Sequence, residues 1–146
     1  MDGIDKAILE ELKRHGRVSA SEISKNVNLS VPAVAERIRK MEGAGVIRGY
    51  TALLDRRKPG AGLLAFVFVN LDRTEHVDAF RREAVLFPCV MECHHTAGVY
   101  DYLLKVALED TAALERFLTD GLKRIPGVAA TNTIITLATL KEAPNP

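Results

Sequence analysis

Apolar residues recur every three or four positions through the first third of the chain, whereas the later part mixes longer apolar runs with such helical stretches. The first pattern predicts three short amphipathic helices, over residues 5–15, 20–27 and 31–42. Ile8 and Leu12 share one face of the first helix, as core-facing residues do. The three helices are therefore expected to pack around one small core.

Polar residues between these helices predict where each helix begins and how the chain turns. Ser19, with Glu22 three positions later, forms a capping box, and Ser30 caps the third helix. Asn28 lies at the sharp turn before the third helix, and asparagine tolerates a left-handed backbone. Pro32 is acceptable in a first helical turn, where N–H groups have no helical partner. The spacing predicts a helix-turn-helix of the winged-helix-like kind.

The second half of the chain predicts a sheet covered by two helices. Strands are expected over residues 63–71, 90–96, 102–108 and 128–140, and helices over 75–87 and from a Thr111 cap to about residue 125. The order βαββαβ implies a ferredoxin-like sandwich, in which both helices lie on one face of an antiparallel four-stranded sheet. The fold class is therefore α+β, and the uncovered sheet face favours a homodimer or a larger assembly.

A run that breaks regular structure, with Pro59, Gly60 and Gly62, separates the two halves. We expect a helix-turn-helix domain at residues 1–50, an extended linker at 51–62 and the βαββαβ domain at 63–146. Up to Lys58 the chain carries 12 Lys and Arg against 8 Asp and Glu, whereas the remainder carries 8 against 11. The net charge of +1 therefore hides a basic module joined to an acidic one.

The third predicted helix carries a cluster of basic residues. A solvated surface is the ordinary interpretation of such a cluster, but here the basic helix follows a tight turn and begins with small residues. This arrangement indicates a recognition helix that enters the major groove of double-stranded DNA. Base contacts are expected from Val31, Pro32, Ala33, Glu36 and Arg37, with a structural role left open for Arg37. Phosphate contacts are expected from Ser30, Arg39, Lys40, Arg56, Arg57 and Lys58.

The sequence offers little for catalysis or metal binding. Cys93 and His95 would lie on one face of a strand and His94 on the other, and their spacing matches no structural zinc site. No catalytic set or phosphate-binding loop is recognisable, so we expect no enzyme, no metal and no cofactor. Without a membrane-spanning run, a signal peptide or a disulfide framework, the protein is expected to be soluble and cytoplasmic.

The segment 97–102 is the best candidate for a ligand site in the second domain. Gly98 frees the backbone to expose N–H groups, and Asp101 places a carboxylate between Tyr100 and Tyr102. One interpretation is a site for a small zwitterion, whose carboxylate meets these N–H groups and whose ammonium meets Asp101. The other interpretation is that Asp101 only caps a turn.

Nearly the whole chain resembles the Lrp/AsnC family, the leucine- and asparagine-responsive or feast/famine regulators. The matching segments are Asp5 with Ile8 and Leu9, LSVPAVAERIRKMEGAGVIRGYTALLD from Leu29, VMECHHTAGVYDYLLKV from Val90, and IPGV from Ile125. Both modules match in the family's order and spacing, which makes the resemblance specific.

The resemblance implies a sequence-specific, nucleoid-associated transcriptional regulator of a bacterium or archaeon that forms dimers and often octamers. It also implies an effector, usually an amino acid, bound between dimers by Thr96, Gly98, Val99, Tyr100, Asp101, Tyr102, Ile134 and Thr136. Two alternatives remain open. Sirohaem decarboxylases have a similar two-module organisation, and the adjacent His94 and His95 keep that enzyme class under consideration. An effector-free architectural protein would instead bind DNA with little sequence preference.

Overall fold

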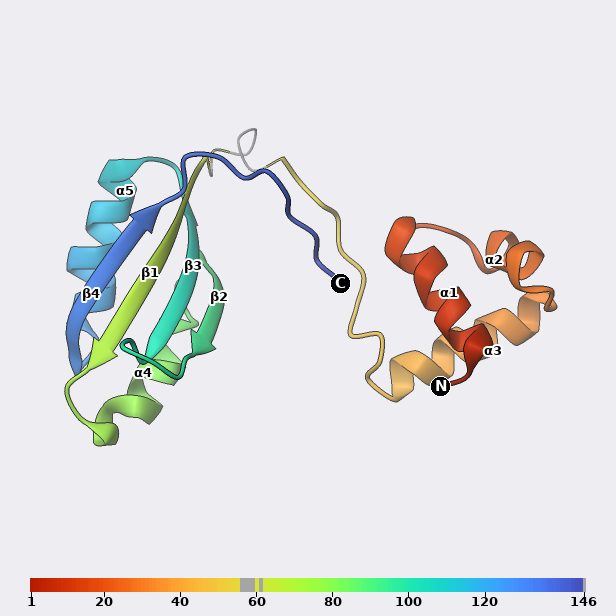
Figure 1. The fold of residues 1–146 in the computed structure, drawn as a ribbon, viewed down its shortest axis with the longest axis horizontal. Coiled ribbons are helices and arrows are strands. Elements are labelled where there is room, and N and C mark those ends of the chain that lie inside the picture. Colours follow the sequence, from red (N-terminus) through yellow and green to blue (C-terminus); the bar gives the residue numbers. More distant parts are fainter. Residues whose placement is uncertain (56–59, 61, 146) are drawn as a thin grey trace. The chain divides into compact units, whose positions relative to one another are not determined.

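The computed structural model describes residues 1–55, 60 and 62–145. The chain divides into two compact units, one comprising Met1–Leu53 and the residues after Glu142, the other Leu54–Glu142. The predicted fold class is confirmed, because a bundle of three helices precedes an antiparallel four-stranded sheet with helices on one face (Figure 1). Each unit has a hydrophobic core of its own.

The first unit consists of helices α1 (Gly3–Arg14), α2 (Ala20–Val27) and α3 (Val31–Gly43). Its core is formed by Ile8, Ile23, Val34 and Met41, none more than 5% exposed. Helix α1 begins two residues earlier than predicted because Asp2 and Asp5 cap it reciprocally. The Asp5 N–H donates to Asp2 Oδ1 at 2.8 Å, and the Asp2 N–H donates to Asp5 Oδ2 at 2.9 Å.

The turn between α2 and α3 forms as predicted. Asn28 is left-handed, with φ 53° and ψ 43°, and Leu29 packs against the core. Ser30 Oγ accepts a hydrogen bond from the Ala33 N–H at 3.4 Å, which satisfies one free donor of the α3 terminus. Helix α3 therefore starts only a few residues after α2 ends, as a helix-turn-helix requires.

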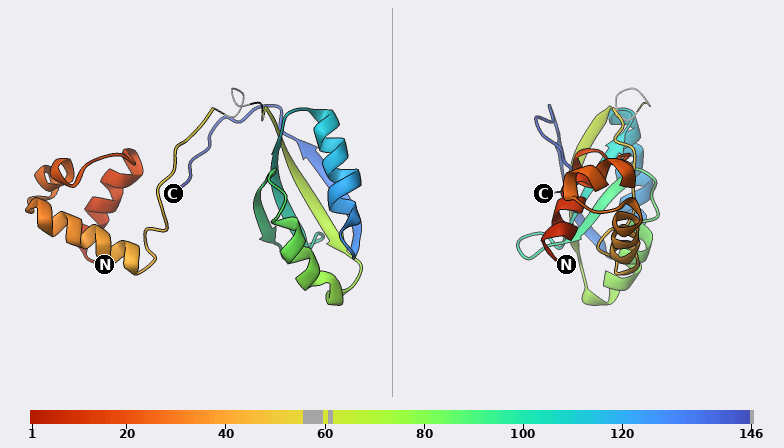
Figure 2. Two further views of the ribbon diagram at one scale, coloured as in Figure 1. Left: turned by 180° about the vertical axis from the view of Figure 1, so that it is seen from behind. Right: turned by 90° about the vertical axis from the view of Figure 1, so that its right-hand side faces the viewer.

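The second unit is built on a sheet with strand order β2-β3-β1-β4. Its strands are β1 (Leu63–Leu71), β2 (Val90–His95), β3 (Tyr102–Leu108) and β4 (Val128–Ile135). On the central strand β1, Ala65, Val67 and Val69 are fully buried in the core between the sheet and the helices. Phe66 and Phe68 alternate with them and reach the opposite face, which no helix covers (Figure 2).

The helices of this unit differ from prediction in length and capping. Helix α4 (Val77–Ala84) follows a 3₁₀ turn (Thr74–His76), and α5 (Thr111–Arg116) continues through a π turn (Phe117–Gly121) and a 3₁₀ turn (Leu122–Arg124). Asp110, not Thr111, caps α5, because its carboxylate accepts the Ala113 N–H at 2.7 Å. Strand β4 ends at Ile135, before the predicted residue 140, where it pairs with Ala65 near the start of β1 at Leu63. Among the described residues, no helix is long and apolar enough to cross a membrane.

A close approach of Gly127 to His76 joins the start of β4 to the region before α4. Gly127 has a φ of +90°, and its carbonyl accepts the Asp72 N–H at 2.9 Å. His76 Nδ1 lies 2.7 Å from Asp72 Oδ1, which holds the imidazole in place. A Cβ atom on Gly127 would overlap the His76 side chain, so only glycine fits this position.

We therefore expect Gly127→Ala to lower the free energy of unfolding by about 2–4 kcal/mol, from the strained φ together with the overlap. Urea denaturation followed by circular dichroism measures this difference. Gly62→Ala is the matched control, because Gly62 has no neighbour within 4 Å and no left-handed φ. Equal losses in the two variants would contradict the packing argument.

Candidate DNA interface and effector site

Solvent reaches the α3 residues that were predicted to contact DNA. Ser30, Val31, Pro32, Arg39 and Lys40 are exposed, and Ala33 and Glu36 are half-buried. The Arg39 and Lys40 side chains are 74% and 73% exposed, whereas Val34 on the opposite face is fully buried. The basic run Arg56, Arg57 and Lys58 lies outside the described residues.

Arg37 is the exception, since the structure gives it the structural role that the sequence left open. Its Nη1 lies 2.8 Å from Asp2 Oδ2 and 2.6 Å from Asp5 Oδ1, so it joins the capping box of α1 to α3. The backbone N–H groups of the box lower the pKa of both carboxyls, and Arg37 lowers them further. Arg37 therefore ties α1 to α3 through one guanidinium nitrogen, Nη1, and its predicted base contact stays a prediction.

Glu36 and Arg39 pair one helical turn apart. Arg39 Nε donates to Glu36 Oε2 at 3.0 Å and Nη2 donates to Oε1 at 2.8 Å, a bidentate geometry. Lys40 Nζ lies 4.0 Å from the same carboxylate. The hydrogen bonds from Arg39 lower the pKa of Glu36, so the carboxylate is ionised near neutral pH.

In the second unit, the loop between β2 and β3 is anchored to β1 through Asp101. The Asp101 N–H donates to the Val69 carbonyl at 3.0 Å and to Asn70 Oδ1 at 3.1 Å. The Asp101 carboxylate accepts the Leu71 N–H at 2.7 Å, which ties the loop to the end of β1, 30 residues away in the sequence. Thr96 closes the loop, because its Oγ1 donates to the Tyr100 carbonyl at 2.5 Å.

The two tyrosines that flank Asp101 face opposite sides of the sheet. The Tyr100 ring packs on Phe68 with centroids 4.9 Å apart, and its hydroxyl accepts from Asn132 Nδ2 at 3.0 Å. Tyr102 is only 2% exposed, and its hydroxyl accepts from Arg81 Nε at 2.8 Å. Tyr102 is therefore mainly a core residue, which the alternation along β3 dictates.

An open cavity of about 380 Å³ lies beside this anchored loop, on the helix side of the sheet. It is lined by Leu71, Asp72, Arg73, Thr74, Val77, His95, Asp101 and Tyr102. Only Asp101 and Tyr102 were predicted as ligand contacts. The others come from the end of β1, the β1–α4 connection, the start of α4 and the end of β2, and no local sequence signal places them next to the loop.

The remaining predicted contacts are not gathered around this cavity. Val99 is 83% exposed, and Gly98 has no neighbour within 4 Å of the position of a Cβ. Ile134 pairs with Phe66, and the Thr136 N–H donates to the Leu64 carbonyl, so both lie nearer the start of β1, whereas the loop is bonded to its end. Within one chain, the eight predicted residues therefore form two separate groups.

The cysteines and histidines serve ordinary packing roles. His94 Nε2 lies 3.0 Å from Glu92 Oε2 on the open face, whereas the His95 ring stacks on Tyr102 at 5.0 Å on the helix side. Burial raises the pKa of the Cys89 and Cys93 thiols. Within the described ranges, no three His, Cys, Asp or Glu side chains gather as metal ligands.

A helix-turn-helix with an exposed basic helix, joined to a βαββαβ module with a small cavity, is the architecture of a two-domain DNA-binding regulator. Residues 64–146 match the Lrp/AsnC ligand binding domain, and residues 1–48 match a winged helix-turn-helix DNA-binding domain. The chain belongs to the Lrp/AsnC family. It is a DNA-binding transcriptional regulator with a ligand-binding domain, and the enzyme alternative is excluded because the family and the relatives are regulators.

Individual relatives resemble the chain over nearly its full length. The leucine-responsive regulatory protein of Escherichia coli (strain K12) is 39% identical over 145 residues, which cover 98% of this chain and 88% of that protein. The structure of the transcriptional regulator NMB0573 of Neisseria meningitidis in complex with L-Met matches with a TM-score of 0.93 at 30% identity, covering 99% of this chain and 94% of that chain. Escherichia coli AsnC matches with a TM-score of 0.91 at 25% identity, covering 97% and 95%.

Arg37→Gln is expected to lower the melting temperature of the DNA-binding unit, and the loss should depend on pH. Because the pKa of Asp2 and Asp5 lies below the ordinary 3.8 in the folded state, their stabilisation is present above that value and is lost as the pH falls through the lowered pKa. The difference between wild type and variant should therefore be largest near neutral pH and shrink below about pH 4.

Far-UV circular dichroism during heating, at several pH values, measures this difference. Arg14→Gln is the control, because Arg14 is 67% exposed and lies 3.9 Å from Glu11. A difference between wild type and Arg37→Gln that does not change with pH would contradict the assigned ion pairs.

Proposed function

We propose that the protein is a sequence-specific regulator that reads DNA with α3 from two identical subunits. Val31, Pro32, Ala33 and Glu36 are assigned to base edges in the major groove, and Ser30, Arg39 and Lys40 to phosphates. The basic run Arg56, Arg57 and Lys58 is also assigned to phosphates, from its positive charge alone. The assignment is carried by the exposed first turns of a helix whose other side is fixed in the core by Val34.

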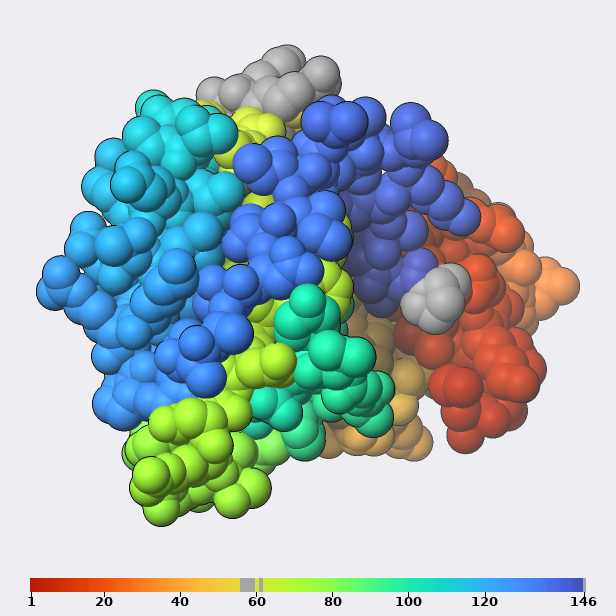
Figure 3. Space-filling model, turned by 60° about the vertical axis from the view of Figure 1, so that its left-hand side comes forward, coloured from red at the N-terminus to blue at the C-terminus, as the bar shows by residue number. Residues whose placement is uncertain are grey.

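The open face of the sheet supports assembly as a homodimer. Phe66 and Phe68 of β1 share this face with Ile134 of β4, which is 53% exposed. The segment after β4 lies at the surface (Figure 3) and carries Leu137 and Leu140, which are 100% and 97% exposed. Leu140 lines a shallow hollow together with Phe66 of the open face. Burial against a second copy under two-fold symmetry would remove these side chains from water.

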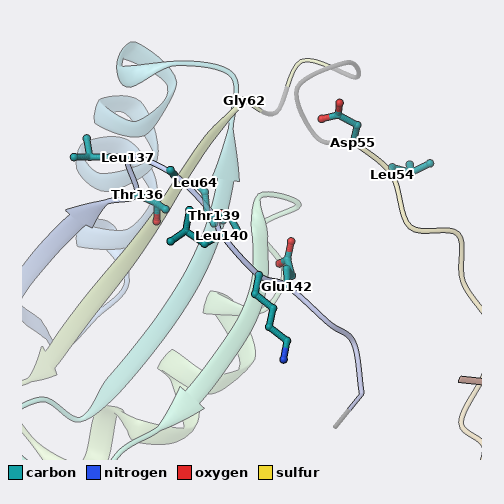
Figure 4. Close-up of a pocket in the computed structure, with 11 residues that line it drawn as sticks. Leu54, Asp55, Gly62, Leu64, Thr136, Leu137, Thr139, Leu140 and Glu142 are labelled. Atoms are coloured by element: carbon teal, nitrogen blue, oxygen red, sulfur yellow. The ribbon is translucent and has the colours of Figure 1, made fainter. Parts of the chain in front are cut away.

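A second cavity, apart from the one beside the loop, lies where the segment after β4 passes the start of β1. A cavity of about 530 Å³ is lined there by residues 136–142, by Leu64 and by linker residues that include Leu54 (Figure 4). It shares Leu64 and Leu140 with the hollow that Phe66 of the open face lines. We assign this second cavity to the same dimer interface and not to a ligand.

An amino acid is the proposed effector. The cavity beside the loop offers carboxylates from Asp72 and Asp101 and cationic or hydrogen-bonding groups from Arg73 and His95, as a zwitterion requires. The L-Met complex of NMB0573 supports the same ligand class. In an octamer or other assembly of dimers, the exposed Gly98 and Val99 of one subunit would face a neighbouring dimer. A regulator that binds chromosomal DNA would act in the cytoplasm, at the nucleoid of a bacterial or archaeal cell.

Titrations of duplex DNA with and without a panel of amino acids, L-methionine included, test the effector. One amino acid is expected to change the protein's affinity for DNA by about 5- to 100-fold. Bound DNA must then change the protein's affinity for that amino acid by the same factor. Asp101→Asn keeps an oxygen to accept the Leu71 N–H but removes the charge. This variant should therefore lose the response and retain DNA binding.

The same titrations at two salt concentrations separate the possible failures. Salt-dependent binding without any amino-acid response would favour an effector-free architectural protein. An absence of salt-dependent binding would refute the DNA-reading function itself.

Ile134→Asp is expected to raise the dimer dissociation constant by about 100-fold or more, because each interface would bury two unpaired carboxylates. Sedimentation equilibrium measures the change. Leu86→Asp is the control, since Leu86 is 75% exposed and follows α4 on the other side of the sheet. Similar effects of the two substitutions would rule out the open face as the interface.

A further inference from the structure

Within the described residues of α3, each cation has a carboxylate nearby. Arg37 is bonded to Asp2 and Asp5, and two of the three guanidinium nitrogens of Arg39, Nε and Nη2, are bonded to Glu36. Lys40 Nζ lies 4.0 Å from the Glu36 carboxylate. One acidic side chain therefore lies against the two α3 cations that we assign to phosphates.

A purely structural role explains this pairing poorly. The side chains of Glu36 and Arg39 are 45% and 74% exposed, and ion pairs this exposed contribute little to folding stability. Helix α3 is already capped by Ser30 and anchored in the core by Val34. The pair is therefore more informative about what happens at the surface of α3 than about how the helix folds.

The surface of DNA changes the energy of such a pair. Phosphates repel a carboxylate and attract a guanidinium, so they compete with Glu36 for Arg39. A carboxylate in the major groove can be compensated only by a donor, and the base edges offer the amino groups of cytosine N4 and adenine N6. When one of these amino groups donates to Glu36, the Glu36 carboxylate has a new partner. The Arg39 guanidinium is then free to bind a phosphate.

We infer that Glu36 is a specificity-determining residue. Glu36 holds Arg39 away from the phosphates until the amino group of a base replaces Arg39 as the partner of the Glu36 carboxylate. The inference rests on the proposed placement of α3 in the major groove. On an unmatched sequence, Glu36 keeps Arg39 and is itself repelled, so binding is weak. On a matched sequence, Arg39 gains a phosphate and Glu36 gains a base contact. Glu36 thus widens the gap between specific and non-specific binding.

Glu36→Gln tests the inference, because glutamine keeps the size of the side chain but lacks the charge that holds the Arg39 fork. Two duplexes of equal length are titrated across a range of salt: one selected in vitro with the wild-type protein, the other of random sequence. Affinity for the random duplex should rise by about 10-fold, and the salt slope should steepen by about one as Arg39 gains a phosphate. Affinity for the selected duplex should not rise, so the ratio of the two affinities falls about 10-fold or more.

Two further variants separate this effect from a general change of charge. Glu10→Gln removes one charge from an i,i+3 pair with Lys13 on α1, at a 53% exposed side chain, and should leave the affinity ratio unchanged. Adding Arg39→Gln to Glu36→Gln should return the affinity for random DNA to about the wild-type value, since the gain depends on the released guanidinium. Far-UV circular dichroism checks that all variants keep the same helix content.

The outcomes distinguish the inference from the function on which it rests. If Glu36→Gln and Glu10→Gln give the same affinity ratio, Glu36 has no part in discrimination, although the protein still reads DNA. If the added Arg39→Gln leaves the gain in random binding intact, the exchange of partners is wrong. If the wild-type protein binds neither duplex in a salt-dependent way, the proposed function fails together with the inference.

Discussion

A four-stranded sheet with helices on one face leaves about half of its side chains outside the core between sheet and helices, and β1 is where this matters most. Val67 and Val69 are fully buried in the core, whereas Phe66 and Phe68, one residue away, reach the face without helices. Burying a large apolar side chain is worth about 1.5–3 kcal/mol, so a partner that covers this face adds substantially to stability. The stability of the second unit is therefore inseparable from its assembly if a second copy is that partner.

The first unit depends on hydrogen-bonded helix ends as much as on its small core. Four buried side chains hold three helices, and each helix begins at a residue whose side chain accepts a backbone N–H. Asp2 and Asp5 serve α1 and also bind Arg37 on α3. The orientation of the recognition helix thus depends on the first residues of the chain, although these were not expected to contact DNA.

Features encoded within a few residues could be predicted from the sequence, and features that join distant residues could not. The Ser19–Glu22 box and the left-handed Asn28 follow from local hydrogen-bonding chemistry, so both appear where the sequence placed them. Arg37 was ambiguous because its partners are more than 30 residues away. The cavity lining was missed for the same reason, since the β1–α4 connection meets the loop only after β1 and β3 pair in register. Asp110 and Thr111 are both good caps, and only the observed backbone separates them.

Tyr100 and Asp101 place the proposed partner surface and the proposed ligand surface one peptide bond apart. The Tyr100 ring lies on Phe68 at the open face, while the Asp101 carboxylate lines the cavity on the helix side. The Asp101 N–H is bonded to Val69, so a ligand that moves Asp101 acts on the strand that carries Phe68 into the interface. Such a ligand shifts the equilibrium between assembled and separated subunits only by the difference in its affinity for the two states. A change in assembly changes DNA affinity, because two helix-turn-helix units joined in a dimer bind DNA with a high effective concentration and separated units do not. If the proposed effector occupies this cavity and the proposed dimer forms through the open face, ligand binding and DNA binding are linked through β1.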